Sequence, residues 1–323
     1  MIYEINAMGS FKKLLLLLML IDSLSAFAFS SILDASISED GNYVALLNHD
    51  VKKNNEIWIL NTGKPGSQRE LTPAFAVTSL KFGLKNNELL FTYRSKKEKF
   101  DSLAMWNLNN LDSPPVTIFN APSLAYPIDL GDGKYMIRSR LDGDRKSYLS
   151  GFQWVLVGNG KVQAIEPKFV LPHAYPNIFE SGFYWLEEKV FDKYEAYPKI
   201  LSFPLPNGEA PKIRGNQFPK NTWAISCDRL GLRCLRSYLS NPNQSGDYLY
   251  GLDIVMIKDG EQCKVQDSLG VINRVSITAN GNAAIASYAQ KGSQQGYVLI
   301  MNFQPGKCLP IIVRKFDFKG ESK

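Results

Sequence analysis

Residues 37–47 read ISEDGNYVALL, and residues 277–287, which lie 240 positions later, read ITANGNAAIAS. Each phrase carries an Asp-Gly or Asn-Gly pair followed within two residues by a run rich in apolar side chains. Such pairs adopt the positive φ angles of tight turns at low cost, so each phrase predicts two antiparallel strands joined by a hairpin. The run Tyr43–Leu47 is apolar on both faces, which predicts a strand that is covered on both sides.

Weaker copies of the turn occur between the two phrases, at intervals of about 46 to 51 residues. The six turns are Asp40-Gly41, Asn86-Asn87, Asp132-Gly133, Ser181-Gly182, the segment 228–231 and Asn280-Gly281. A second marker, a short apolar run beyond each turn, has a similar period, and its first three copies contain Trp58, Trp106 and Trp154. Two markers with one period indicate a repeated unit of about 48 residues that contains four short strands.

A single four-stranded sheet with two apolar faces cannot bury both of them alone. Six units fit between residues 31 and 318, and a radial ring covers both faces of every sheet and exposes only short outer edges. The sequence therefore predicts an all-β, six-bladed β-propeller of four-stranded antiparallel blades, with seven blades as the less favoured count. One propeller domain is expected over 29–318, before a short tail at 319–323, with blades at about 31–75, 76–121, 122–171, 172–214, 215–269 and 270–318. Ring closure would make the first and last units neighbours.

The repeated phrase also resembles that of a known family. S-x-D-G-N-Y-V-A-L-L, then I-W-I-L-N and E-L-T, is similar to the WD40-like repeat of TolB-type propellers and of the propeller domains of prolyl-oligopeptidase-family enzymes. The residues that carry the resemblance are Ser38, Asp40–Leu47, Ile57–Asn61 and Glu70–Thr72. The resemblance implies the propeller fold and a tendency towards binding outside the cytoplasm, and it implies no single function because this repeat serves many.

The N-terminal segment is typical of a signal peptide. Two lysines precede the apolar run Leu14–Ile21, and the next residues have the small-x-small spacing of a cleavage site that ends at Ala28. We expect residues 1–28 to be removed, and Met8 is a second candidate start. The run is far shorter than the roughly 20 residues that span a bilayer, so no transmembrane anchor is expected. The mature protein is predicted to be exported, to the periplasm or the medium.

Export implies an oxidising compartment in which the four cysteines, all in the last third of the chain, can form disulfides. Aligning Ile225–Leu235 with the first hairpin places Cys227 and Cys234 on either side of one turn, which favours their pairing. Cys263 and Cys308 align at equivalent places near the outermost strands of consecutive units. A ring radius near ~20 Å separates such places by far more than the roughly 7 Å that a disulfide permits. We therefore expect that these two cysteines do not pair.

The sequence predicts no catalytic residue, no cofactor and no metal ligand. The two histidines, His49 and His173, stand alone in loops, and the G-x-S-x-G motif of serine hydrolases is missing. The cysteine spacing does not fit zinc, and Asp142 and Asp144 lack the further acidic ligands of a calcium loop. The aromatic residues in 183–198 are predicted to fill gaps between blades. The net charge of +6 is far from a nucleic-acid-binding signature.

The loops between the second and third strands of each unit open on one face of a propeller. In units two and three they are basic, whereas in units five and six they are close to neutral. The basic residues are Arg94, Lys96, Lys97, Lys99, Arg138, Arg140, Arg145 and Lys146. One interpretation is a solvated rim; the other is a surface that attracts an acidic protein or peptide partner.

Three hypotheses on function remain open. The chain is an exported, TolB-like, non-catalytic scaffold that binds a protein or peptide in the cell envelope. Alternatively, it is a propeller enzyme whose site, built from single residues of several blades, lies in the central channel and leaves no local motif. The third hypothesis is a stand-alone propeller related to prolyl-oligopeptidase-type peptidases. Three or more carboxylates that converge in the channel would favour the enzyme.

Overall fold

The computed structural model of the protein describes fourteen segments of the chain. They are residues 32–48, 56–63, 68–71, 76–94, 99–140, 152–165, 177–179, 182–187, 199–210, 221–230, 232–240, 249–257, 260–289 and 296–318. The predicted signal peptide and both histidines lie outside these segments.

The described strands form six antiparallel sheets, and each sheet is built from strands that are consecutive in the sequence. We name these sheets blades 1 to 6 in chain order. Blade 1 consists of β1 (Ile32–Ile37), β2 (Tyr43–Asn48), β3 (Glu56–Asn61) and β4 (Gln68–Leu71). Blade 2 consists of β5 (Ala76–Phe82), β6 (Glu88–Arg94), β7 (Asp101–Asn107) and β8 (Val116–Ala121), with a short 3-10 helix, η1 (Leu108–Asn110), after β7.

The remaining blades repeat this order. Blade 3 consists of β9 (Ser123–Gly131), β10 (Lys134–Arg140), β11 (Phe152–Gly158) and β12 (Lys161–Ile165). The described residues of blade 4 form three strands, β13 (Asn177–Phe179), β14 (Gly182–Glu187) and β15 (Lys199–Pro204). Blade 5 consists of β16 (Thr222–Cys227), β17 (Arg233–Leu239), β18 (Tyr250–Met256) and β19 (Gln262–Leu269). Blade 6 consists of β20 (Val271–Ile277), β21 (Ala283–Ala289), β22 (Gly296–Asn302) and β23 (Ile312–Phe318).

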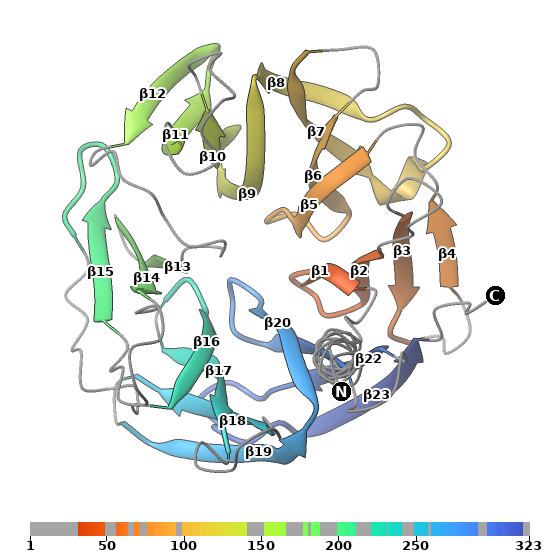
Figure 1. The fold of residues 1–323 in the computed structure, drawn as a ribbon, viewed down its shortest axis with the longest axis vertical. Coiled ribbons are helices and arrows are strands. Elements are labelled where there is room, and N and C mark those ends of the chain that lie inside the picture. The colour runs from red at the N-terminus through yellow and green to blue at the C-terminus, as the bar shows by residue number, and fades with distance from the viewer. Residues whose placement is uncertain are drawn as a thin grey trace, which may run out of the picture.

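The sheets stand side by side around a central axis, with the first strand of each blade innermost and the last strand at the rim (Figure 1). This arrangement confirms the all-β propeller that the repeat predicts. Within the described segments, no helix has the length and apolar character needed to cross a membrane.

The two copies of the repeated phrase form the same turn. Gly41 and Gly281 both have φ of +72°, and each donates its N–H to the carbonyl of the residue three positions earlier. Asp40 accepts hydrogen bonds from the Ser38 hydroxyl and from the backbone N–H of Asn42, so its carboxylate stabilises the turn. Asn280 occupies the same place in blade 6 and accepts from the Thr278 hydroxyl and the Asn282 N–H.

The hydrophobic core consists of layers between neighbouring blades. One layer joins the two ends of the chain: Val44 and Leu46 of β2 pack in one cluster with Ile285 of β21 and with Val298 and Ile300 of β22. Blades 1 and 6 are therefore neighbours in the ring, as the closure of the repeat predicts.

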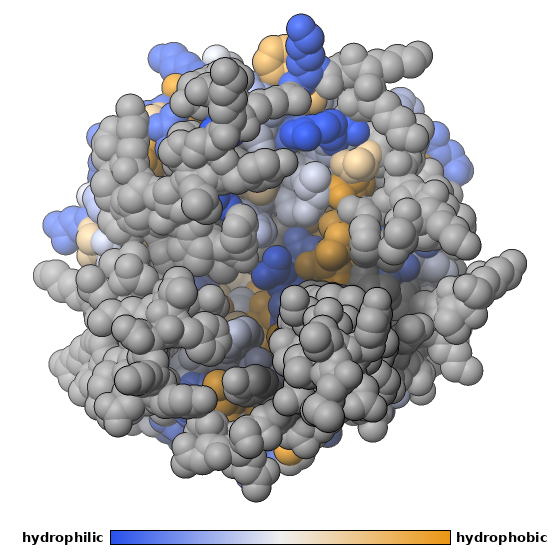
Figure 2. Space-filling view, in the orientation of Figure 1, coloured by the Kyte–Doolittle hydropathy of each residue, from blue (hydrophilic) through white to orange (hydrophobic). Residues whose placement is uncertain are grey.

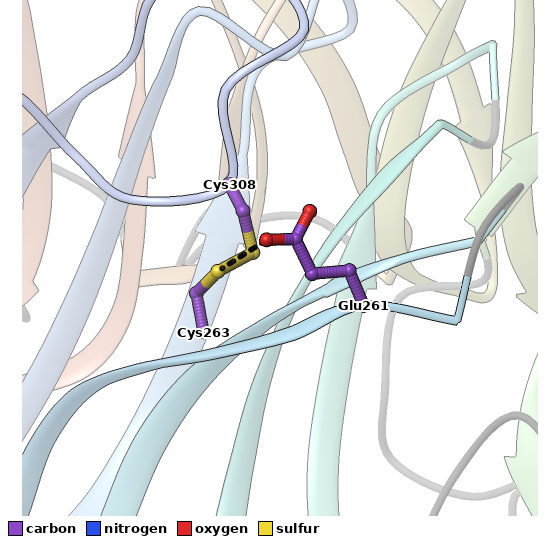
Figure 3. A group of neighbouring side chains, drawn as sticks. All are labelled: Glu261, Cys263 and Cys308. Carbon is purple, nitrogen blue, oxygen red and sulfur yellow. Dashed lines mark hydrogen bonds between the residues drawn. A yellow bond between two sulfur atoms is a disulfide. The ribbon is translucent and has the colours of Figure 1, made fainter.

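The structure contains a Cys227–Cys234 disulfide, the pair that the hairpin alignment favours; these residues lie opposite each other on β16 and β17. It also contains a Cys263–Cys308 disulfide, with Cα atoms 5.8 Å apart, so the expectation that these cysteines do not pair is wrong. Cys263 lies on the outer strand β19, whereas Cys308 lies before β23, in the connection that follows β22 (Figure 3). The alignment treated a residue of a connecting segment as a residue of an outer strand.

That connection extends from blade 6 onto blade 5. Cys308 is buried in the cluster that contains Ile254 of β18, and the Arg233 guanidinium of β17 donates to the backbone carbonyls of Gln304 and Lys307. The two cysteines are thus brought together by a segment that crosses from one blade to the next. An alignment of the repeated units assumes that each residue stays within its own blade, so it does not detect such a contact.

Candidate functional site

The innermost strands of the blades surround a cavity of about 130 Å³ at the centre of the ring. Figure 2 shows a hollow in the middle of one face, where hydrophilic and hydrophobic residues both lie exposed to view. Six charged residues line the cavity, three acidic and three basic: Asp34, Glu39, Asp129, Lys81, Arg229 and Arg274. Because they come from blades 1, 2, 3, 5 and 6, only ring closure brings them together.

Polar side chains in the inner strands link four pairs of neighbouring blades. The Asp34 carboxylate of β1 accepts the backbone N–H of Leu80 on β5 at 3.1 Å, and Asn177 of β13 accepts the N–H of Cys227 on β16 at 2.7 Å. Comparable bonds run from Tyr126 N–H to Ser79, from Ile277 N–H to Ser226 and from Phe82 N–H to Ser36. A buried N–H without a partner is costly, so these side chains stabilise the ring, and all of them except Ser79 also line the central cavity.

Further hydrogen bonds join different blades at the end of the ring where the β1–β2 turn lies. Glu39 accepts the backbone N–H groups of Ala279 and Asn280 in the equivalent turn of blade 6. Arg229, in the same turn of blade 5, donates its backbone N–H to the carbonyl of Ala279 in blade 6 at 2.8 Å, and its Nη2 donates to the carbonyl of Leu130 in blade 3 at 2.8 Å. The Arg229 side chain therefore joins blade 5 directly to blade 3, which is not its neighbour in the sequence.

A second contact crosses the channel between blades 6 and 3. The Arg274 guanidinium of β20 lies 3.4 Å from the Asp34 carboxylate, measured from Nε to Oδ1, and its Cζ is 6.0 Å from the centre of the Tyr126 ring. Tyr126 has φ of +58° within strand β9, a conformation that non-glycine residues rarely adopt and that costs free energy. Burial raises the pKa of Tyr126, and the charge of Arg274 opposes this effect.

Burial perturbs two of the charged groups in opposite directions. The pKa of Lys81 is lowered from its ordinary value of 10.5 because burial disfavours the ammonium, and the charges of Asp34 and Glu39 oppose the shift without cancelling it. The pKa of Glu39 is raised above 4.5, again chiefly by burial, although the N–H groups of Ala279 and Asn280 favour the carboxylate. Paired perturbations of this kind are typical of functional sites and also occur in structural networks.

The predicted basic surface is only partly described. Arg138 and Arg140 belong to strand β10 and are buried, so the interpretation that they lie in an exposed loop is wrong. Strand β10 extends to Arg140 because residues 138–140, which read RSR, pair with β11 on one side and with β9 on the other. Arg94, the last residue of β6, binds the Asp101 carboxylate through Nε and Nη2, at 2.6 and 3.0 Å. Lys99 is exposed. Lys96, Lys97, Arg145 and Lys146 lie outside the described residues.

Two other sequence features have clear places. Phe183 of β14 is buried and packs in one cluster with Tyr126, Met136 and Trp154 of blade 3, which is the gap-filling role predicted for the aromatic residues of unit four. Among the described residues, Glu261, Cys263 and Cys308 lie close enough together to suggest a metal site (Figure 3). The two sulfur atoms are bonded to each other, however, and a metal requires thiolates.

The channel residues were not identified from the sequence. Asp34, Glu39, Lys81 and Arg274 are single residues in four separate places and form no motif. One signal could have found some of them: a polar residue within an otherwise apolar inner strand, repeated from unit to unit, as with Asp34, Ser79, Asn177 and Ser226.

Comparison with known proteins identifies the fold. No family model and no curated protein matches the chain. Among solved structures, an acylaminoacyl peptidase in complex with Z-Gly-Gly-Phe-chloromethyl ketone has a TM-score of 0.50 and 17% identity, with 90% of this chain and 46% of that chain covered. The protein shares the β-propeller fold of this peptidase. At such an identity the likeness concerns the fold alone.

Other similar structures include the two groups that the repeat resembles. The β-propeller domain of the Trilobed protease from Pyrococcus furiosus has a TM-score of 0.49 and 17% identity, with 88% of this chain and 85% of that chain covered. TolB from Acinetobacter baumannii has a TM-score of 0.35 and 14% identity, with 84% of this chain and 51% of that chain covered. The chain spans about half the length of TolB and of the acylaminoacyl peptidase.

Proposed function

We propose that this protein is an exported, TolB-like propeller that binds a protein or peptide partner in the cell envelope and catalyses no reaction. The observation that carries the proposal is the use of the channel carboxylates. Each of Asp34, Glu39 and Asp129 accepts two backbone N–H groups, and in each case at least one of these belongs to a neighbouring blade.

Three carboxylates at a channel would favour a propeller enzyme, and the hydrogen bonds that they accept are our reason for favouring the non-catalytic hypothesis instead. A general acid or base needs an oxygen within reach of a substrate proton. In this ring the carboxylate oxygens hold turns and strands of adjacent blades in place. The charged centre therefore acts as a scaffold, and partner binding is assigned to the outer surfaces.

Two disulfides in the described residues support export, because disulfides persist in oxidising compartments. The first test is the mass of the protein recovered from the cell envelope. We expect a chain that begins at Phe29, after removal of residues 1–28. A full-length chain confined to the cytoplasm would contradict the proposal.

The second test is partner capture. A photo-crosslinker placed at residues 95–98 or 141–151 is expected to trap a distinct protein in the intact envelope. Reversing Lys96, Lys97 and Arg145 to glutamate should weaken capture, and added salt should weaken capture by the unmodified protein. The matched control reverses Lys134 and Lys161, which are exposed at the opposite end of blade 3. Equal capture by both variants would exclude Lys96, Lys97 and Arg145 as part of the binding surface.

A further inference from the structure

The disulfide that joins blades 5 and 6 has an oxygen atom beside each of its sulfur atoms. The Cys263 Sγ lies 3.5 Å from Oε1 of Glu261, two residues earlier (Figure 3). The Cys308 Sγ lies 3.7 Å from the carbonyl oxygen of Ile254 on β18. A disulfide sulfur carries no hydrogen, so neither contact is a hydrogen bond in the oxidised protein, whereas a thiol in either place has an acceptor within reach. The surroundings of both sulfur atoms therefore suit free thiols as well as the disulfide.

The two sulfur atoms and one carboxylate oxygen of Glu261 lie within 4.8 Å of one another. A tetrahedral zinc ion with Zn–S bonds of about 2.3 Å and a Zn–O bond of about 2.1 Å holds its ligand atoms roughly 3.6 to 3.8 Å apart. The distance of 3.5 Å between Glu261 Oε1 and Cys263 Sγ already meets this requirement. Once their bond is broken, the sulfur atoms separate by rotation of the side chains, because the Cα atoms of Cys263 and Cys308 are 5.8 Å apart. The three groups therefore reach one zinc ion with little movement of the backbone.

Other contacts hold the backbone of these residues in place when the disulfide is broken. The carbonyl of Glu261 accepts the backbone N–H of Met256 at 2.8 Å. The connection that carries Cys308 is held on blade 5 by the Arg233 guanidinium, which donates to the carbonyl of Lys307. Cys308 itself is 5% exposed and packs in the core cluster of blades 5 and 6. Reduction therefore leaves the three ligand groups side by side.

The two disulfides within the described residues differ in their access to solvent. Cys263 is half-buried and lies on β19, the outer strand of blade 5. Cys227 and Cys234 are 8% and 0% exposed, and they lie opposite each other on two paired strands. Thiol–disulfide exchange needs a path for the attacking thiolate to one of the sulfur atoms. A dithiol is therefore expected to reach Cys263 and to break the Cys263–Cys308 disulfide first.

We propose that reduction by a dithiol converts the Cys263–Cys308 disulfide into a zinc site, in which the two thiolates and the Glu261 carboxylate bind Zn²⁺ and a water molecule completes the tetrahedron. A thiolate of the dithiol attacks Sγ of Cys263, the S–S bond breaks, and its electron pair stays on Sγ of Cys308, which takes up a proton. The second thiol of the reductant then displaces the Cys263 sulfur, and the reductant leaves as its own disulfide. Zinc binding releases the two thiol protons.

Zinc in this position replaces the disulfide as the link between blades 5 and 6. Thiolates are soft ligands that favour zinc over magnesium and calcium, which prefer oxygen ligands. Because the fourth ligand is water, the ion keeps one position open to an outside ligand. The site is separate from the protein- or peptide-binding surface proposed above, and either can exist without the other.

The first test follows Co²⁺, which stands in for zinc, by absorption spectroscopy of the mature protein. The protein is reduced with dithiothreitol, the reductant is removed without air, and Co²⁺ is added. We expect a thiolate-to-cobalt charge-transfer band in the reduced protein and none in the oxidised protein, and we expect Zn²⁺ but not Mg²⁺ to abolish the band. No band in the reduced protein, or the same band in the oxidised protein, would overturn the proposal.

Two pairs of variants locate the ligands. The Cys263→Ser/Cys308→Ser variant should lose the band, whereas Cys227→Ser/Cys234→Ser, which keeps all three ligands, should retain it. Glu261→Gln should weaken zinc binding about tenfold or more, since even a group behind a zinc ligand is worth about that much. Glu209→Gln, on an exposed glutamate of blade 4, is the matched control and should leave zinc binding unchanged. An unchanged zinc affinity of Glu261→Gln would remove this residue from the site.

Alkylation of the unmodified protein provides a measurement that does not depend on the folding of a variant. During partial reduction, iodoacetamide should label Cys263 and Cys308 before Cys227 and Cys234, as read by peptide mass. After reduction, Zn²⁺ should slow the labelling of Cys263 and Cys308, and Mg²⁺ should not. The opposite order of labelling, or no protection by Zn²⁺, would refute the assignment.

Discussion

The carboxylate of Glu39 accepts the backbone N–H of Ala279 at 2.7 Å, across 240 residues of sequence. Its other oxygen accepts the N–H of Asn280 at 3.1 Å, and the Asn280 side chain donates back to the Glu39 carbonyl at 2.9 Å. The two clearest copies of the repeated phrase therefore bind each other directly. The turn that marks the repeat in the sequence also closes the ring.

Replacing Glu39 with glutamine should destabilise the protein. A glutamine side chain has one acceptor oxygen for two N–H donors, and its amide NH2 faces the second donor. Loss of such a hydrogen bond costs about 1–3 kcal/mol. We expect the free energy of unfolding in urea to fall by this amount at pH 7, and an unchanged value would show that the contact does not contribute to closure.

The same variant has a predictable pH dependence. The folded-state pKa of Glu39 is raised above 4.5, so its contribution to stability is complete below that pH and declines as the pH rises through the raised pKa. The glutamine variant lacks this titration. The difference in unfolding free energy between the two proteins should therefore be larger at pH 4 than at pH 7; the reverse order would mean that the two N–H groups outweigh burial.

Gly41 should tolerate substitution less well than another glycine with the same backbone conformation. Its φ is +72°, and a Cβ atom there would lie 3.0 Å from the Cβ of Ala283 and from Nδ2 of Asn302, both in blade 6. Gly133 has φ of +69° but has no atom within 4 Å of such a Cβ. Gly133→Ala should cost about 1 kcal/mol for the left-handed conformation alone.

Gly41→Ala should cost about 2 kcal/mol or more, because overpacking adds to the conformational cost. Thermal and urea unfolding of the two variants, side by side, separates these contributions. Equal losses would indicate that blades 1 and 6 move apart enough to accept the methyl group.

The fold was predictable because its signals are local and repeated. The turn chemistry of Asp40-Gly41 and the two apolar faces of Tyr43–Leu47 depend only on neighbouring residues, and recurrence at one period amplifies them. The candidate site was not predictable, since the environment of Glu39 is set by residues 240 positions away. Burial of Lys81 likewise arises only when the ring closes.

Two predictions from the sequence were wrong for the same reason. Arg138 resembled a loop residue because it begins a polar run, yet pairing on both sides extends β10 through Arg140. Cys308 resembled a strand residue because the alignment used a uniform unit length, yet it lies in a segment that crosses to blade 5. Local pattern assigns an element type, whereas contacts between blades decide where such residues lie.

The two disulfides should contribute unequally to stability. Cys263 and Cys308 are separated by 45 residues, and Cys227 and Cys234 by 7. In the chain-entropy model, removing the longer loop constraint costs about 4 kcal/mol and removing the shorter one about 2 kcal/mol. Urea unfolding of the Cys263→Ser/Cys308→Ser and Cys227→Ser/Cys234→Ser double variants should show this order.

The pairing itself is checked by peptide mapping without reduction. A Cys263–Cys308 linked peptide is expected from protein recovered from an oxidising compartment. Free thiols at both positions would show that the β22–β23 connection does not hold the two blades together covalently.

The buried ion pair of blade 5 should be the most sensitive of the charged contacts. Arg236 and Asp253 face each other on β17 and β18, with exposed side-chain fractions of only 4% and 7%, and the Arg236 Nε donates to Asp253 Oδ1 at 2.7 Å. The guanidinium also donates to the Thr222 hydroxyl at 3.2 Å. Asp253→Asn leaves a buried positive charge without a counter-charge, which costs about 3–5 kcal/mol.

The double variant Arg236→Met/Asp253→Leu should lose less stability than Asp253→Asn, because no uncompensated charge remains and apolar side chains suit the site. Lys264→Met is the matched control: it removes an exposed pair with Asp267 on the outer strand of the same blade and should change stability by less than about 1 kcal/mol. Unfolding free energies in urea decide the order. If the double variant proved less stable than Asp253→Asn, the pair would be a net source of stability, and the attraction between its charges would exceed the cost of burying them.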